Sequence, residues 1–194
     1  MNALNAAVVA AVLAAPAAWA QQFTFDAATG CAGLNAGVRG PCGDLRGKDL
    51  SGADLSRLDL RGARLDGAKL VGASLQGANL AGASLENADL SRAVLTGAKL
   101  ARASLAGARL VGAHLEQAML TEATLTGADL RNACLYRASF ERADLRTATF
   151  SRSRALVAGA KFVKAVVSAG TLPYETAELA ALEVQVAVVE LTSL

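Results

Sequence analysis

The chain has 194 residues, a formal net charge of +2 and 53% hydrophobic residues, and this length suits one domain with terminal segments. The longest uncharged interior stretch, Leu70–Leu85, is interrupted by Ser, Gln, Asn and Gly residues. It therefore lacks the ~20 mainly apolar residues that a membrane-spanning helix needs, and no transmembrane segment is expected in the mature chain.

Residues 1–20 are predicted to be a signal peptide. Ala6–Ala15 is an unbroken run of Ala, Val and Leu, Pro16 ends it, and Ala18-Trp19-Ala20 has the small-x-small pattern of a cleavage site. Met1–Asn5 contains no Lys or Arg, so either the α-amino group supplies the positive charge or the true start lies upstream. A short buried helix is the alternative to a signal peptide. Cleavage after Ala20 would make the protein periplasmic or secreted.

Residues 21–42 are expected to form an N-terminal cap over the first coil of the fold. Cys31 and Cys42 flank a short Gly-rich segment, and an oxidising compartment would let them form a disulfide. Closing so small a loop contributes about 2–3 kcal/mol. Cys134 is then left without a partner.

A five-residue repeat dominates the centre of the chain. From Leu45 to Phe150 every fifth residue is Leu or Phe, for 22 consecutive positions, and two residues earlier stands Ala without exception from Ala63 to Ala148. In a helix five residues advance about 500°, which scatters the leucines around the axis. In a flat strand a step of five sends successive leucines to opposite faces. The pattern therefore predicts a chain that turns every five residues, with Leu and Ala pointing inward.

Glycine marks the predicted corners. It stands at the second position after the Leu in 11 of the 22 units, as a tight turn with positive φ would favour. Arg, Asn, Gln, Glu and Thr occupy the other units, so glycine is favoured there and not required.

These units, such as Ala88–Arg92 and Ala128–Asn132, resemble the pentapeptide-repeat family, whose pattern is Ala-(Asp/Asn)-Leu-x-x. The resemblance implies an all-β solenoid, expected over residues 43–164. Its coils would form a right-handed quadrilateral parallel β-helix of about 5.5 to 6 turns, with four pentapeptides in each. The sequence itself indicates a register break after Phe150, because Ala155 stands where Leu is due. The Asp/Asn position is kept at Asp44, Asp49, Asp54, Asp59, Asn79, Asp89, Asp129 and Asp144.

The charges independently support a coil of four pentapeptides. Pairs of charged residues 20 apart number eight of opposite sign and one of like sign, Asp66/Glu86, whereas offsets of 10 and 15 each give four opposite and five like. The eight pairs are Asp44/Arg64, Arg46/Asp66, Asp49/Lys69, Lys69/Asp89, Asp89/Arg109, Arg109/Asp129, Arg102/Glu122 and Glu122/Arg142. Residues at this offset should therefore stack at the strand spacing of ~4.8 Å.

Residues 165–194 are expected to be a C-terminal cap or dimerisation segment. Leucines and valines at helical spacing predict an amphipathic helix over Leu172–Glu190, while alternating valines at 184, 186 and 188 allow a strand instead. The segment 172–190 would either cover the open end of the coil or join two copies into a homodimer. Residues 128–164 hold eight basic and three acidic side chains, whereas residues 165–194 hold four acidic and none basic, so the tail could dock on the basic end.

Few residues suggest chemistry. His114 is the only histidine, so one chain cannot build a histidine-rich metal site, and we expect no catalytic, cofactor-binding or metal-binding residues. His114 and Cys134 should stack on adjacent coils, with Glu116 and Tyr136 beside them. A Cys–His contact would lower the pKa of the thiol, and with Glu116 it offers three groups able to bind metal. The alternative is a chance gathering of surface residues.

The sequence thus predicts an exported, non-enzymatic pentapeptide-repeat protein that serves as a rigid interaction or structural module. Its expected partner is an unidentified protein or an anionic envelope component such as a polysaccharide or lipid headgroups, and not nucleic acid. The resemblance also offers an alternative, a DNA-mimicking, gyrase-binding protein of the quinolone-resistance type. That role requires a strongly acidic rod, which the net charge of +2 disfavours. An enzyme on the outer face is a third class, for which the sequence offers no converging acid and base groups.

Overall fold

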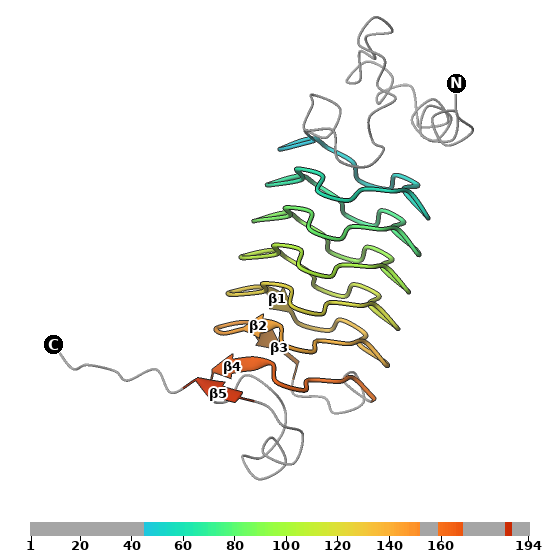
Figure 1. Ribbon diagram of the computed structural model, residues 1–194. Helices are drawn as coiled ribbons and strands as arrows, with labels where there is room; N and C mark the ends of the chain where they lie inside the picture. Colours follow the sequence, from blue (N-terminus) through green and yellow to red (C-terminus); the bar gives the residue numbers. More distant parts are fainter. Residues whose placement is uncertain (1–44, 152–158, 169–184, 188–194) are drawn as a thin grey trace, which may run out of the picture.

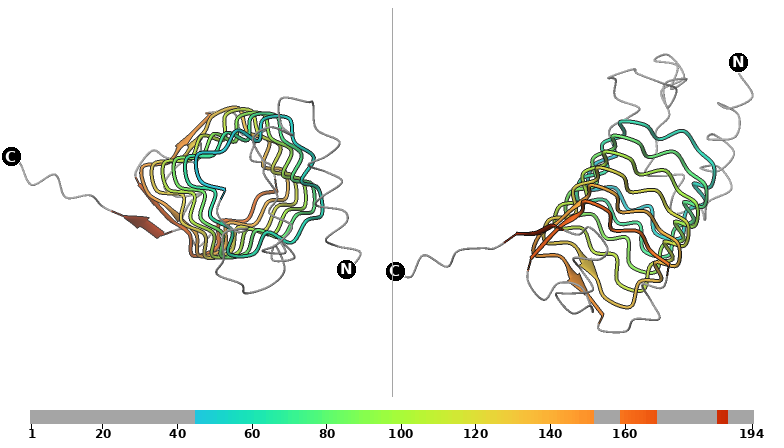
Figure 2. Two further views of the ribbon diagram at one scale, coloured as in Figure 1. Left: turned by 90° about the horizontal axis from the view of Figure 1, so that it is seen from above. Right: turned by 60° about the horizontal axis from the view of Figure 1, so that its bottom comes forward.

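The computed structural model describes residues 45–151, 159–168 and 185–187. These residues wind into successive coils that stack into one column (Figure 1). In each unit one residue forms a parallel backbone bridge to its counterpart four units later, beginning with Asp49 and Lys69 and continuing to Thr124 and Asp144. Because the chain turns once in every unit, each coil has four corners, and Figure 2 shows the stacked outline from above. The chain is a β-solenoid, as the repeat predicts.

Most of the inter-coil contacts are single bridges, and only short segments form strands. The strands of the described residues are β1 (Asp129–Leu130), β2 (Asp144–Leu145), β3 (Thr149–Phe150), β4 (Val166–Ser168) and β5 (Gln185–Ala187). All pairings are parallel: β1 pairs with β3, and β4 lies between β2 and β5.

The two inward registers form the core. Every residue of the Leu register from Leu60 to Leu145 is at most 1% exposed, and every alanine of the second register from Ala63 to Ala148 is at most 5% exposed. No polar or charged side chain is buried in the described residues. Removing one such leucine side chain from water stabilises the fold by about 1.5–3 kcal/mol. Both predicted registers are confirmed.

The corners impose a left-handed backbone conformation. Every fifth residue from 47 to 147 has φ between 56° and 71°, whether it is one of the 11 glycines or one of the 10 other residues. The corner N–H donates across coils, as from Gly52 to the Val71 carbonyl at 2.9 Å, and a bond from Lys48 N–H to the Leu45 carbonyl closes the turn. These hydrogen bonds hold even non-glycine residues in a conformation that costs them about 1 kcal/mol or more.

The Asp/Asn position of the repeat has a structural role at the next corner. Asp49 Oδ1 accepts a hydrogen bond from the backbone N–H of Ser51 at 3.1 Å, and Asp89 does the same for Ser91 at 3.0 Å. Short polar side chains satisfy nearby backbone donors in this way at turns. This local bond explains why the position favours Asp or Asn.

The repeat is interrupted after Phe150, and the coil resumes two residues out of phase. Ser139 bridges to Lys161, and Phe162 replaces a leucine in the core, where it stacks on Phe140 with ring centroids 5.1 Å apart. Asp144 pairs with Val166, so the same offset persists into β4. The register beyond Phe150 is therefore shifted by two residues, and the core continues beyond the shift.

The predicted amphipathic helix over 172–190 is wrong where it can be checked. Residues 185–187 form β5, in which Val186 pairs with Val167 of β4. The unpaired edge of β4 offers hydrogen bonds to an extended chain, and a β-branched segment takes them. The alternative strand around Val186 is the correct one. The remaining residues of 172–190 lie outside the described part of the chain.

Several predictions concern residues that are not described. The signal peptide of residues 1–20, the cap of residues 21–42 and the Cys31–Cys42 disulfide all lie outside the described residues. In the part of the chain that is described, no helix has the length and apolar character needed to cross a membrane.

We name the four sides of the column A to D by the segments that stack on each. Side A consists of the segments that begin at residues 48, 68, 88, 108, 128 and 148. Side B begins at 53, 73, 93, 113 and 133, and side C begins at 58, 78, 98, 118, 138 and 160. Side D begins at 63, 83, 103, 123, 143 and 165.

Candidate functional site

Side B brings together the four residues predicted as a surface cluster. His114 and Cys134 are bridge partners on successive coils, and Glu116 and Tyr136 follow two residues later on the same coils. His114 Nδ1 lies 3.2 Å from Glu116 Oε1. The Tyr136 side chain is 43% exposed, and the Arg137 guanidinium carbon lies 5.0 Å from its ring centroid, within the range of a cation–π contact.

The electrostatics of the cluster differ from those expected of a Cys–His pair. Partial burial raises the pKa of the Cys134 thiol, and the Glu116 carboxylate raises it further, although a hydrogen bond from the Tyr136 backbone acts in the opposite direction. For Glu116, burial acts to raise the pKa, but bonds from its own backbone N–H, His114 and Cys134 outweigh burial and lower it. The expected lowering of the thiol pKa by His114 is therefore wrong in direction, because the carboxylate and burial dominate.

The cluster does not assemble a metal site. Across residues 45–151, 159–168 and 185–187, no three His, Cys, Asp or Glu side chains are placed to hold a metal ion together. Glu116 is engaged by neighbouring donors, including the Thr96 hydroxyl at 3.2 Å. The cluster presents a tyrosine, an arginine and a neutral thiol, which are groups suited to contact with a partner surface.

Three Asp-Leu-Arg segments form ion pairs within one coil that sequence reasoning missed. The Nη2–Oδ2 distances are 2.7 Å for Arg61 and Asp59, 2.6 Å for Arg131 and Asp129, and 2.6 Å for Arg146 and Asp144. In an extended segment, residues two apart point the same way, so the tripeptide itself was the available signal. A hydrogen bond with the arginine is the main cause that lowers the pKa of each of these aspartates.

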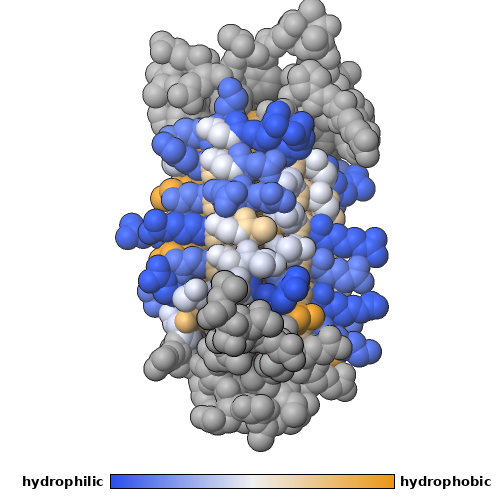
Figure 3. Space-filling view, turned by 90° about the vertical axis from the view of Figure 1, so that its left-hand side faces the viewer, coloured by the Kyte–Doolittle hydropathy of each residue, from blue (hydrophilic) through white to orange (hydrophobic). Residues whose placement is uncertain are grey.

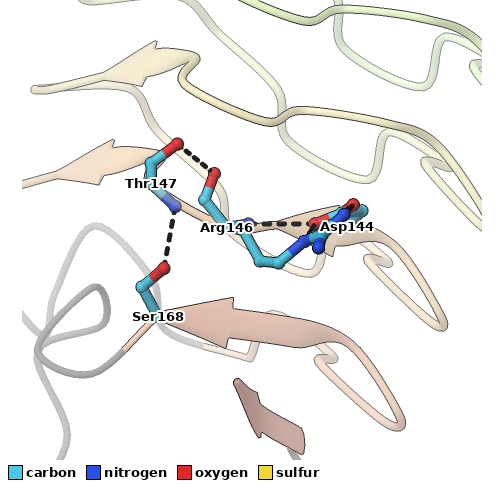
Figure 4. A network of polar contacts seen from close by, with 4 residues as sticks. All are labelled: Asp144, Arg146, Thr147 and Ser168. Carbon is cyan, nitrogen blue, oxygen red and sulfur yellow. Dashed lines mark hydrogen bonds and ion pairs between the residues drawn. The ribbon is translucent and has the colours of Figure 1, made fainter. Parts of the chain in front are cut away.

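One of these segments connects to the end of the column. Arg146 pairs with Asp144, while the backbone N–H of Thr147 donates to Ser168 Oγ of β4 at 3.0 Å (Figure 4). The Thr147 hydroxyl donates to the Arg146 carbonyl at 2.6 Å. Thr147 has φ of 56°, which is unusual for a β-branched residue. The corner is thus held by the ion pair of Arg146, the hydrogen bond to Ser168 and the hydrogen bond of the Thr147 hydroxyl.

A corner column between sides C and D confirms the stacking predicted from charge. Glu122 accepts from Arg102 at 2.8 Å on one neighbouring coil and from Arg142 at 3.2 Å on the other. Each of these residues stands at a corner with positive φ. Two of the eight predicted stacked pairs therefore form direct ion pairs in this column.

The basic belt over residues 128–164 is partly neutralised. Among the arginines that form it, Arg131 and Arg146 pair with aspartates of their own coils, Arg142 pairs with Glu122, and Arg137 lies over Tyr136. Arg152 lies outside the described residues. The belt therefore does not form one continuous patch of free arginines.

Side D is rich in small hydroxyl side chains. Ser84 donates to Asp66, and Ser104 Oγ donates to Glu86 Oε1 at 2.9 Å, each across neighbouring coils. Figure 3 shows one side of the column, where weakly polar side chains run down the middle and strongly hydrophilic ones line the margins. The outer sides of the column therefore differ from one another in the side chains that they carry, whereas the interior is uniform.

The comparisons with known proteins concern the repeat. The family model described as pentapeptide repeats matches in eight copies, in overlapping segments that together span residues 43–152. No curated protein matches the chain significantly.

Solved structures with a similar fold include three of different origin. HetL, a pentapeptide repeat protein involved in heterocyst differentiation regulation from the cyanobacterium Nostoc, is 27% identical over 73% of this chain and 71% of its own, with a TM-score of 0.45. A pentapeptide repeat protein of the Arabidopsis thaliana thylakoid lumen is 26% identical over 76% and 82%, with a TM-score of 0.23. Full-length QnrB1, a plasmid-mediated fluoroquinolone resistance protein, is 18% identical over 72% and 94%, with a TM-score of 0.30. At these TM-scores the likenesses carry no argument about function.

Proposed function

Because the chain belongs to the pentapeptide-repeat family, we propose that it is a rigid, non-enzymatic binding module that presents the sides of its column to a partner. The observation that carries this proposal is that the described residues separate completely into an apolar interior and an exterior that carries the polar side chains. Apolar residues, mainly Leu and Ala, occupy the interior, and every polar side chain of the described residues lies outside it. Chemistry can therefore take place only on the outer sides, which are regular and held by inter-coil hydrogen bonds.

The finer architecture belongs to the same proposal. We propose that the coil is right-handed, as chains of L-residues prefer for parallel crossovers, and that it makes about 5.5 to 6 turns. The continuity of parallel pairing from Asp49 to Ser168 supports the extent of the column.

Export is the second part of the proposal. The apolar run Ala6–Ala15 and the Ala18-Trp19-Ala20 pattern support cleavage after Ala20 and a periplasmic or secreted location. A Cys31–Cys42 disulfide would then close the N-terminal cap. Cell fractionation with N-terminal sequencing tests this part: a mature chain that begins at Gln21 supports export, and an uncleaved cytoplasmic chain contradicts it.

The DNA-mimicking alternative is disfavoured by the outer sides. On side A the outward positions alternate in sign along the column, in the order Asp49, Lys69, Asp89, Arg109 and Asp129. A protein that imitates DNA must present a continuous line of negative charge, and alternation of sign cancels such a line at short range.

The binding module is tested by retention of a partner from the envelope fraction of the source cell. The mature protein is immobilised, and a Leu105→Asp variant with a disrupted core serves as the unfolded control. The proposal predicts a defined partner, protein or anionic material, that is retained by the folded column and not by the control. Turnover of a substrate by the column alone, or retention identical to that of the control, would contradict it.

A further inference from the structure

Positive charge gathers on one side of the column. In the segments of side C from 98 to 164, five cationic side chains stand against two acidic ones. The cations are Lys99, Arg102, Arg142, Lys161 and Lys164, and the acids are Glu122 and Glu141. We call this set of segments, 98–102, 118–122, 138–142 and 160–164, the cationic surface. Side D carries more acidic than basic side chains, and the described residues of side A hold five basic against three acidic ones, so the positive excess is largest on side C.

The cations of this surface are accessible. Lys99, Lys161 and Lys164 are exposed and make no ion pair with any described residue. Arg102 and Arg142 share the single carboxylate of Glu122, and their side chains remain 78% and 52% exposed. Because two arginines share one carboxylate, the group keeps a net positive charge. The surface can therefore bind anions without first breaking a buried contact.

The surface is flat and fixed by the backbone. Lys99, Met119, Ser139 and Lys161 are successive bridge partners in one column. Three steps at the strand spacing span about 14 Å between the two lysines. The corner column of Arg102 and Arg142 runs parallel to it, held by bonds such as Arg142 N–H to the Val163 carbonyl at 2.9 Å. Cations therefore stand at both ends of a planar strip.

The middle of the strip carries one exposed apolar side chain. Met119 is 41% exposed and Thr121 on the same segment is half-buried, while the acidic Glu122 and Glu141 stand toward the corner. The outward positions of these four segments carry no aromatic side chain, which a sugar polymer would use for stacking. A flat strip with cations at its margins and an exposed methionine between them matches a lipid surface, where anionic headgroups meet acyl chains.

We propose that the cationic surface docks on an anionic lipid bilayer, with Lys99, Lys161 and Lys164 at headgroup phosphates and Met119 at the apolar boundary. This inference rests on the proposed binding function and names one partner class for one side. The expected attraction is electrostatic, because each lysine or arginine near an anionic membrane adds to binding and salt screens it.

The test is sedimentation of the full chain with vesicles of phosphatidylcholine alone or mixed with phosphatidylglycerol. The variant Lys99→Gln/Lys161→Gln/Lys164→Gln removes three charges from side C. Its matched control, Lys48→Gln/Lys69→Gln/Arg92→Gln, removes three exposed cations from side A. The proposal predicts roughly a hundredfold weaker binding to the anionic vesicles for the side C variant, with the control close to the parent chain. Binding of the parent chain should also weaken with added salt.

Other occupants of the surface give different results. Equal binding of all chains to both vesicle types, without salt dependence, would mean that the apolar run at residues 6–15 anchors the protein, and would overturn the proposal. Binding that appears only after Glu183→Gln/Glu190→Gln would assign the surface to the chain's own acidic tail, and would also overturn it. If the parent chain does not bind the anionic vesicles while the side C variant still retains a protein partner, the lipid proposal is wrong. The proposed function as a binding module is then still supported.

Discussion

Ser139 lies beside Lys161 on the next coil, and this step along the chain is longer by two positions than the step between the bridge partners Thr124 and Asp144. The additional positions fall between Phe150 and Phe162. They do not displace the core, because the Phe162 ring stacks on Phe140 at an interplanar angle of 6°. The stacking of buried side chains therefore restores the coil after the repeat has been interrupted. As a result, Lys161 continues the column that Lys99 begins, and Lys164 stands at a corner like Arg142.

The inward register is tested by Leu105→Ala beside Ala106→Gln. Leu105 is fully buried and Ala106 is partly exposed on side D. We expect Leu105→Ala to lower the free energy of unfolding by about 2–5 kcal/mol through lost transfer energy and a cavity, and Ala106→Gln to change it by less than about 0.5 kcal/mol. Denaturant melts measure both. A greater loss of stability for Ala106→Gln than for Leu105→Ala would show that the inward positions have been assigned wrongly.

The strain of the corners is tested by opposite substitutions at two of them. Thr147 has φ of 56°, and Gly97 has φ of +66° with no atom within 4 Å of the Cβ that an alanine would add. We expect Thr147→Gly to stabilise the fold and Gly97→Ala to destabilise it, each by about 1 kcal/mol, because only glycine adopts positive φ without cost. Thermal unfolding measures both shifts. Two shifts of the same sign would show that backbone strain is not the cause.

Acid should lower the stability of the folded protein by protonating the aspartates of its Asp-Leu-Arg segments. Hydrogen bonds from Arg131 and Arg146 lower the pKa values of Asp129 and Asp144 in the folded chain. A depressed folded pKa gives stability that is present above the unfolded value, about 4, and is lost as the pH falls through the folded value. We expect melts to show this loss below about pH 4.

The matched variants for the acid prediction are Asp129→Asn and Arg131→Gln. Each removes the charge pair, and the asparagine can still accept the hydrogen bond from the Arg131 backbone N–H, which is 3.1 Å long with the aspartate. Both variants should lose less stability between neutral and acid pH than the parent chain. The difference should be small and sensitive to salt, since these pairs are exposed. An unchanged pH profile for both would show that the ion pair does not contribute to the loss in acid.

Cys134 should be a poor nucleophile. Burial and the Glu116 carboxylate raise the pKa of its thiol, and alkylation requires the thiolate. The pH at which Cys134 alkylation reaches half its maximal rate should therefore lie above that of an unperturbed cysteine. Glu116→Gln should lower this pH by removing the nearby negative charge, while His114→Gln serves as the comparison. A midpoint below the usual thiol value in the parent chain would contradict the electrostatics of the cluster.

The column could be predicted from the sequence because burial imposes a strict period. Leu105 and Ala103 belong to registers that recur without exception, and no regular helix or strand buries residues at a spacing of five. The step between coils was visible in charge pairs such as Glu122 and Arg142, which are bonded in the structure. Corners such as Arg92 could not be assigned from residue type alone, since the fold imposes positive φ on arginine and glycine alike.

Other features depend on a choice between competing structures or contacts, and local sequence patterns do not determine that choice. The segment around Val186 has both helical and alternating spacing, and the open edge of β4 decides for a strand. Pairs such as Asp129 and Arg131 were missed because charges were compared between coils, while the shorter contact lies within one coil. The Cys134 thiol interacts with the Glu116 carboxylate, although its bridge partner is His114, and this choice depends on distances that spacing does not contain.

Every placement of a residue on side A, B, C or D depends on a coil of four repeat units, and a disulfide cross-link measures that coil directly. In chains with Cys31→Ser and Cys42→Ser, His114→Cys places a second thiol at the bridge partner of Cys134, and Thr124→Cys places one on side D instead. Mild oxidation followed by peptide mass spectrometry reports the linkage. We predict an intramolecular disulfide between positions 114 and 134 and none between 124 and 134. Equal cross-linking of both chains, or linkage only from position 124, would contradict a coil of four units.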